Sequence, residues 1–150
     1  MALAIAQRSL CTRDQVGAII TDSMNKVIGE GYNGPPSGFW HYQRSCTSWC
    51  ERGSGITKDL LLPDYADCPA LHAEANALMM SDRALRLGGT IYVISHICFT
   101  CAKLIANSGL SNVVVSTTEE HEHRNAFGSY EFMVKCGLNV IVNGQKVIIS

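Results

Sequence analysis

The sequence predicts an α/β domain built around a mixed β-sheet. Three observations favour this class: a chain of 150 residues, short β-branched runs separated by helix-forming segments, and a strand–helix–strand succession in the second half. A chain of this length buries roughly 70% of its unfolded surface on folding, so it sustains one core without disulfide bonds. There is no apolar run of about eighteen residues, so no membrane partner is expected.

The first third of the chain predicts a short helix, a hairpin and a long loop. Apolar residues recur with helical spacing over 2–10, and β-branched runs over 16–20 and 26–31 flank a turn-forming segment, as in two antiparallel strands. Glycines and prolines then begin an irregular region of about residues 31–68. A loop this long is usually functional or held by another interaction. We treat residues 1–150 as one domain that carries it.

Helices and strands alternate in the second half. Residues 70–86 are rich in Ala, Leu and Met, with Pro69 suited to a first helical turn and Gly88 to a stop. The remaining expected elements are a strand over 91–95, a helix over 99–107, a strand over 113–116, a helix over 126–136, and strands over 140–142 and 146–149. The first three of these form a βαβ unit with parallel strands.

Charge and cysteine content narrow the function. Twelve Lys and Arg against thirteen Asp and Glu give a formal charge of −1, so no positive field attracts a nucleic-acid backbone and no polymeric nucleic acid is expected as partner. The N-terminus lacks the pattern of a secretory signal, which predicts a cytoplasmic location. In that reducing compartment, seven cysteines favour metal binding or catalysis over disulfides.

Two motifs supply a candidate metal site. Cys98 and Cys101 begin a predicted helix, where positions i and i+3 share a face and the helix dipole favours thiolates. His72 lies at the start of another predicted helix. One histidine and two cysteines leave a fourth tetrahedral position for water, as a catalytic zinc requires. Glu74 is placed to take the proton of that water and pass it to a leaving nitrogen.

This combination predicts a hydrolytic deaminase. Taken alone, a H-x-E triplet is common by chance, and a C-x-x-C pair also occurs in redox and structural zinc sites. Together they match the zinc-deaminase signature.

The motifs together resemble the deoxycytidylate (dCMP) deaminase family. The matching stretches, in the family's order over roughly residues 5–142, are QVGA at 15–18, GYNGP at 31–35, HAEANA at 72–77, and IYV at 91–93 followed by CxxCAKLI at 98–105. The resemblance implies a three-layer α/β/α cytidine deaminase-like fold with a mixed five-stranded sheet. It also implies conversion of dCMP to dUMP and ammonia, with zinc-bound hydroxide attacking C4 of the pyrimidine.

The resemblance assigns roles to individual residues. His72, Cys98 and Cys101 would hold zinc, and Glu74 would move protons. Asn33 would contact the sugar or base of the substrate, and Arg13 its phosphate.

The chain departs from the family before its first C-x-x-C cysteine. The family has proline at this position, and this chain has Ile97, preceded by His96. Proline fixes φ and removes a donor, so its absence is expected to loosen or redirect the loop beside the pocket. His96 is a candidate contact for base or phosphate, with a partly exposed loop histidine as the alternative.

The long loop carries candidate ligands for a second, structural zinc. They are Cys11, His41, Cys46, Cys50 and Cys68, and some bacterial and phage members of the family hold such an ion. A closed four-ligand site would fix a loop that buries little apolar surface. The alternative is a set of ordinary reduced cysteines. Our expectation is two zinc ions per chain.

The resemblance also implies partners. It predicts a homo-oligomer, commonly a hexamer, activated by dCTP and inhibited by dTTP, with Mg²⁺ accompanying a triphosphate effector. The glycine-rich turn at 31–38 is expected near that effector, since backbone N–H groups cradle phosphate. The location would be the cytoplasm of a bacterium or of a phage-infected host cell.

Other functions stay open at this point. A modified dCMP or dCTP is an alternative substrate. Adenosine in tRNA is disfavoured by the charge and by the absence of a Lys/Arg run. A zinc-stabilised nucleotide-binding module without enzymatic activity is the alternative from another class. Glu74 argues against it, because a structural site has no use for a carboxylate beside an open metal position.

Overall fold

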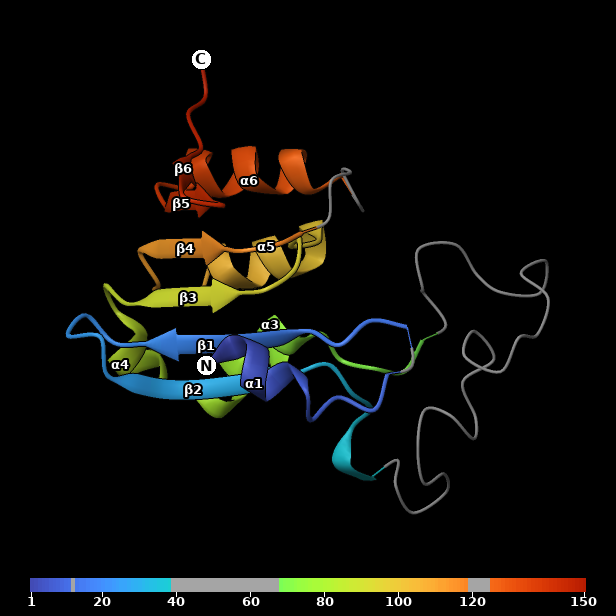
Figure 1. The fold of residues 1–150 in the computed structure, drawn as a ribbon. Helices are drawn as coiled ribbons and strands as arrows, with labels where there is room; N and C mark the ends of the chain where they lie inside the picture. Colours follow the sequence, from blue (N-terminus) through green and yellow to red (C-terminus); the bar gives the residue numbers. More distant parts are fainter. Residues whose placement is uncertain (12, 39–67, 119–124) are drawn as a thin grey trace.

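The computed structural model describes residues 1–11, 13–38, 68–118 and 125–150 (Figure 1). They form a six-stranded mixed sheet in the order β2-β1-β3-β4-β5-β6. The strands are β1 (Gly17–Thr21), β2 (Val27–Tyr32), β3 (Thr90–Val93), β4 (Asn112–Val115), β5 (Asn139–Val142) and β6 (Gln145–Lys146). The helices are α1 (Ala2–Ala6), α3 (Ala73–Met80), α4 (Arg83–Arg86), α5 (Phe99–Ala106) and α6 (Ala126–Lys135). Within these ranges, no helix has the length and apolar character needed to cross a bilayer.

The expected hairpin is present, and helices cover both of its faces. Strands β1 and β2 are antiparallel, and Ala18 pairs with Gly31. A Cβ on Gly31 would collide with the backbone of α3, whereas a Cβ on Gly17 would collide with the backbone of α1. Consecutive residues of a strand point to opposite faces. The sheet is therefore the middle layer, with α1 on one side and α3 on the other (Figure 1).

The expected βαβ unit is also confirmed. Strand β3 pairs parallel with β4, and β4 pairs parallel with β5, while β3 is antiparallel to β1. Helix α5 connects β3 to β4. The residues that fill the core beneath this unit are fully buried and apolar: Ile91, Val93, Ile105, Val113, Val115 and Val140. Burial of such side chains contributes about 1.5–3 kcal/mol each.

Two expectations about the elements are corrected. The sheet has the six strands that the residue pattern predicts, one more than the five that the resemblance implies, but the last strand is shorter than expected. The chain turns back after β5 through Asn143 and Gly144, both at positive φ, and adds only the two-residue strand β6 in place of a strand over 146–149. The single helix expected over 70–86 is two helices. Asp82 interrupts it in an extended conformation, and its side chain accepts a 2.7 Å hydrogen bond from the Ala84 N–H as the N-cap of α4.

Candidate metal centre and active site

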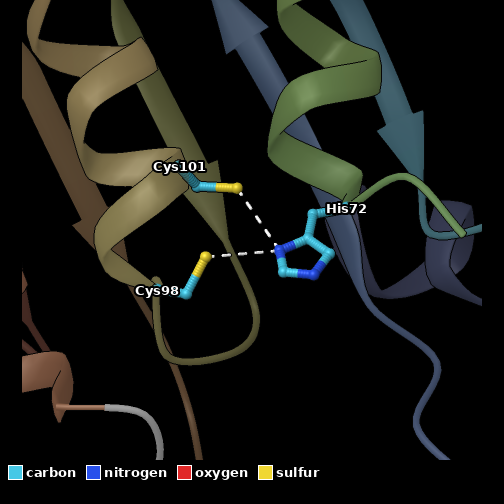
Figure 2. A group of neighbouring side chains, drawn as sticks. All are labelled: His72, Cys98 and Cys101. Carbon is cyan, nitrogen blue, oxygen red and sulfur yellow. Dashed lines mark hydrogen bonds between the residues drawn. The ribbon is translucent and has the colours of Figure 1, made fainter. Parts of the chain in front are cut away.

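Three side chains from two helix N-termini meet at one point. His72 Nδ1 lies 3.4 Å from Sγ of Cys98 and 3.4 Å from Sγ of Cys101, and all three ligand atoms lie within 4.8 Å of one another. Figure 2 shows the imidazole facing both sulfurs. His72 is the N-cap of α3, and Cys98 is the N-cap of α5. The spacing of the motifs thus predicts this cluster correctly.

The cluster has the dimensions of a tetrahedral zinc site. With Zn–S bonds of about 2.3 Å and Zn–N bonds of about 2.0–2.1 Å, a nitrogen and a sulfur ligand lie about 3.6 Å apart. The observed nitrogen–sulfur separations of 3.4 Å agree with this value. One histidine and two thiols are also the donors that zinc prefers. The residues therefore fit a zinc ion with three protein ligands.

The two thiols titrate as one unit without a metal. A hydrogen bond from the Cys101 thiol lowers the pKa of Cys98 to about 3, and His72 adds to this lowering. The same hydrogen bond raises the pKa of Cys101, and burial and the negative charge of Glu74 raise it further. The pair thus keeps one thiolate and one shared proton. A divalent cation would displace that proton, because metals bind the thiolate form.

Glu74 lies against this cluster from the first turn of α3. Its side chain is only 3% exposed, and its charge acts on Cys101 as described above. Glu74 is thus a buried acid next to the candidate metal ligands, where the sequence motif predicts a group that transfers protons.

The segment that carries His72 is held by backbone contacts. Leu71 and Gly34 exchange two hydrogen bonds of 2.8 and 3.1 Å. The Asn76 side chain donates a 2.8 Å bond to the Tyr32 carbonyl. These bonds tie both sides of His72 to the end of β2.

The loop that carries Cys98 is held by side chains. Ile97 has no exposed surface and belongs to the core, so the loop has an apolar anchor at the position where the family has proline. His96 is half-buried, and its Nδ1 lies 2.7 Å from the Tyr130 hydroxyl of α6. The expected loosening of this loop is thus opposed by two contacts that reach the core and α6.

The candidate substrate residues lie at the end of β2 and in the loop before β1. The Asn33 side chain forms two hydrogen bonds to the backbone of residues 14–16. Arg13 is exposed, within that same loop. Asn33 is adjacent to Gly34, which pairs with Leu71, the residue before His72.

The candidates for a second metal are only partly in the described chain. Cys11 and Cys68 are half-buried. His41, Cys46 and Cys50 lie outside the described residues. Within the described ranges, His72, Cys98 and Cys101 are the one group of three or more potential ligands close enough to share an ion.

Sequence reasoning missed Tyr130, Asn76 and Ser9 as supports of the site. Tyr130 is separated from His96 by 34 residues, and Ser9 from Asn33 by 24. All three have other polar residues nearby in the sequence, such as Arg8, Glu74 and Ser129. No sequence signal therefore singles them out, and only the fold supplies the partner.

The fold and the cluster together define a class: an α/β/α protein with a cluster that fits a three-ligand zinc ion between two helix N-termini. The chain belongs to the cytidine and deoxycytidylate deaminase family, because the family's zinc-binding region matches residues 1–117. Family membership confirms the resemblance seen in the motifs, and the zinc-binding character of the family agrees with the observed cluster.

Individual relatives agree with this assignment. The chain is 42% identical over 118 residues to the deoxycytidylate deaminase of Mycobacterium phage D29, covering 76% of this chain and 87% of that protein. It is 34% identical over 126 residues to the human deoxycytidylate deaminase, covering 84% of this chain and 66% of the human protein. The dCMP deaminase of cyanophage S-TIM5, solved with dCMP and dUMP, superposes with a TM-score of 0.67 at 27% identity, covering 94% of this chain and 90% of that chain.

Proposed function

We propose that this protein deaminates dCMP hydrolytically to dUMP and ammonia, with zinc held by His72, Cys98 and Cys101. The observation that carries the proposal is a buried carboxylate, Glu74, beside a cluster with the size and donors of a three-ligand zinc site. The nucleotide is taken from the relatives, which are named for deamination of deoxycytidylate. One water is consumed, and the amino group on C4 leaves as ammonia.

The chain's own residues handle the protons. Zinc, when bound, supplies the Lewis acidity that makes water a nucleophile near neutral pH. A carboxylate oxygen of Glu74 would accept the proton that water loses and donate it to N3 of the pyrimidine. It would then accept the proton of the hydroxyl group now on C4 and donate it to the amine that leaves as the C4–N bond breaks and the C4 carbonyl forms. Burial of Glu74 keeps bulk water away from these transfers, which strengthens its interactions with the charges that develop.

Recognition of the nucleotide is assigned to the loop before β1 and the end of β2. Arg13 would bind the phosphate, because a guanidinium pairs with phosphate oxygens through two hydrogen bonds. Asn33 is expected beside the sugar or base. His96 precedes Cys98 by two residues, and its bond to Tyr130 makes it a candidate wall of the pocket.

Further properties follow from the family. A second zinc would hold the long loop through four of Cys11, His41, Cys46, Cys50 and Cys68. A homo-oligomer, commonly a hexamer, would be regulated by dCTP and dTTP, with Mg²⁺ bound to the triphosphate. The protein would act in the cytoplasm of a bacterium or of a phage-infected cell.

Replacing Glu74 by glutamine tests the chemistry. Glu74→Gln keeps the size of the side chain and removes its ability to accept a proton. We expect ammonia release from dCMP to fall by about 10²–10⁴-fold, with about one zinc per chain retained at the His/Cys/Cys site. The matched control is Glu30→Gln, at an exposed position of β2, which should keep full activity. Full activity of Glu74→Gln would overturn the mechanism.

A substrate panel tests the assignment of dCMP. Ammonia release is compared for dCMP, CMP, dCTP, deoxycytidine and a 5-modified dCMP. The highest kcat/KM is expected for dCMP. If another cytosine nucleotide has a higher kcat/KM, that nucleotide is the substrate in place of dCMP, and the role of Glu74 is unaffected. If none of the compounds releases ammonia, the proposal that the protein deaminates cytosine nucleotides is rejected.

A further inference from the structure

The side chain of Asn33 is fully engaged with the backbone of the loop before β1. Its Oδ1 accepts a 2.9 Å hydrogen bond from the Val16 N–H, and its Nδ2 donates a 2.8 Å bond to the Asp14 carbonyl. The Asn33 N–H also donates to the Val16 carbonyl at 3.3 Å. The oxygen faces a donor and the nitrogen faces an acceptor, so the amide orientation is fixed by its partners.

Ser9 closes the same loop from its other end. Its hydroxyl is buried, donates a 2.8 Å bond to the Asn33 carbonyl, and accepts a 3.2 Å bond from the Cys11 N–H. The Gln15 side chain donates a 2.8 Å bond to the Ser9 carbonyl. Both ends of the segment 9–16, which we call the 9–16 loop, therefore meet at Asn33. Arg13 lies within this closed loop.

The other side of Asn33 leads to the metal centre. Gly34 exchanges two backbone hydrogen bonds with Leu71, the residue before His72. The Tyr32 carbonyl accepts the bond from Asn76 of α3. Residues 32–34 are thus bonded to α3 on one side and to the 9–16 loop on the other.

We infer that Asn33 is a positioning residue, which fixes the 9–16 loop and its Arg13 at a set distance from the metal centre and so favours a phosphorylated nucleotide over the nucleoside. The inference rests on the proposed function. In a nucleotide the phosphate lies at a limited range of distances from C4, so the cation that binds it must be held at a matching distance. An arginine on an untethered loop loses conformational entropy on binding.

A direct contact between Asn33 and the sugar or base has a different consequence. Such a contact serves dCMP and deoxycytidine alike, because both carry the same sugar and base. A residue that acts by placing Arg13 serves only the substrate that has a phosphate. The ratio of kcat/KM for the two substrates therefore separates the two roles.

The experiment compares Asn33→Ala, Ser9→Ala and Arg13→Gln with the unmodified protein in the zinc-loaded state. A displacement of about 1 Å at a binding group costs up to about 10²-fold in rate. We expect each variant to lower the dCMP-to-deoxycytidine ratio of kcat/KM by about 10- to 100-fold. The dCMP-to-deoxycytidine ratio of the double variant Asn33→Ala/Arg13→Gln should be no lower than that of Arg13→Gln. Both substitutions remove the same interaction, the one between Arg13 and the phosphate.

Asn107→Ala is the matched control. Asn107 is exposed at the end of α5. The Asn107→Ala variant should therefore have the same dCMP-to-deoxycytidine ratio of kcat/KM as the unmodified protein. Three results would overturn the inference: an equal loss for both substrates in Asn33→Ala, an unchanged ratio in Ser9→Ala, or multiplicative losses in the double variant.

Amide hydrogen exchange tests the positioning independently of activity. Removing Oδ1 in Asn33→Ala should speed exchange of the Val16 N–H, while the amides of β3 keep their protection. Unchanged exchange at Val16 refutes the positioning role even if dCMP is the substrate. If the unmodified protein fails to deaminate dCMP, the proposed function fails, and this inference about specificity fails with it; the exchange result then reports only whether Asn33 tethers the loop.

Discussion

The two halves of the metal centre are held in different ways. The half that carries His72 and Glu74 is fixed mainly by main-chain contacts between α3 and β2. The half that carries Cys98 and Cys101 is fixed by side chains that reach the core and α6. Both halves present a helix N-terminus to the same point (Figure 2).

Close approach of backbones defines the histidine half. A Cβ on Gly31 would meet the backbone of Ala73 and Ala77, and a Cβ on Gly29 would lie 2.9 Å from the Ala77 carbonyl oxygen. Helix α3 therefore lies directly on the strand, with no side chain between them. The paired backbone of Gly34 and Leu71 continues this contact up to His72.

Side-chain packing defines the cysteine half. Ile97 and Cys101 are buried in the same core cluster, and His96 bonds to Tyr130. Phe99 of α5 also packs against Phe132 of α6, with ring centroids 5.0 Å apart. When one side chain in such packing is shortened, part of the stabilisation is lost and the neighbouring side chains adjust. A backbone in close contact cannot move aside without shifting the whole helix.

The largest effect is expected from a methyl group in the histidine half. Gly31→Ala inserts a Cβ into the backbone of α3, so the helix must move away and carry His72 and Glu74 with it. We expect a loss of at least about 4 kcal/mol in the free energy of unfolding, measured by urea denaturation. Zinc content after dialysis should fall as well, because one of three ligands is displaced.

The control for this substitution is Gly38→Ala. No described atom lies within 4 Å of the position of a Cβ on Gly38, and the stability of this variant should stay within about 0.5 kcal/mol of the unmodified protein. Normal stability and zinc content in Gly31→Ala would show that α3 is not held by the close approach, and the contrast between the halves would disappear.

A smaller effect is expected from a cavity in the cysteine half. Ile97→Ala removes a fully buried side chain beside Cys98. The expected loss is about 3 kcal/mol in the free energy of unfolding, with zinc retained at saturating metal but released faster to a chelator. Ile148→Ala, at a position 79% exposed, is the control and should be near neutral. A loss below about 1 kcal/mol at Ile97 would mean that the loop does not depend on this anchor.

The same difference explains what could be predicted from the sequence. Each half of the metal cluster follows from local spacing: H-x-E at one helix start and C-x-x-C at another, each within one turn. The two halves are 26 to 29 residues apart, and their meeting is predicted only by the match of the combined motifs to the zinc-deaminase signature. The β-branched runs and stop glycines predict the hairpin and the βαβ unit from short-range signals, and the structure confirms both elements.

The corrections have causes that short-range patterns do not contain. Residues 70–86 have helix-forming composition throughout, yet Asp82 caps a new helix in place of continuing the first, because tertiary contacts outweigh propensity. The sequence predicts a loosened loop at Ile97, because the local pattern does not show that this side chain is buried in the core cluster. The bonds of His96 and Asn33 also join distant segments.

The smallest effect tests the polar contact of the cysteine half. Tyr130→Phe keeps the ring, which is 4% exposed, and removes the hydroxyl that lies 2.7 Å from His96 Nδ1. We expect a loss of about 1 kcal/mol in the free energy of unfolding.

If that bond also restrains Cys98 through the adjoining backbone, zinc should dissociate up to about fivefold faster, the equivalent of 1 kcal/mol. The measurement is transfer of zinc to a chromogenic chelator. Tyr92→Phe is the matched control, because the Tyr92 hydroxyl has no bond among the described residues, and its rate of zinc loss should be unchanged. A lower stability of Tyr130→Phe with an unchanged rate would show that the hydroxyl stabilises α6 alone. The restraint on Cys98 would then rest on Ile97, and the cysteine half would be held by apolar packing without a polar component.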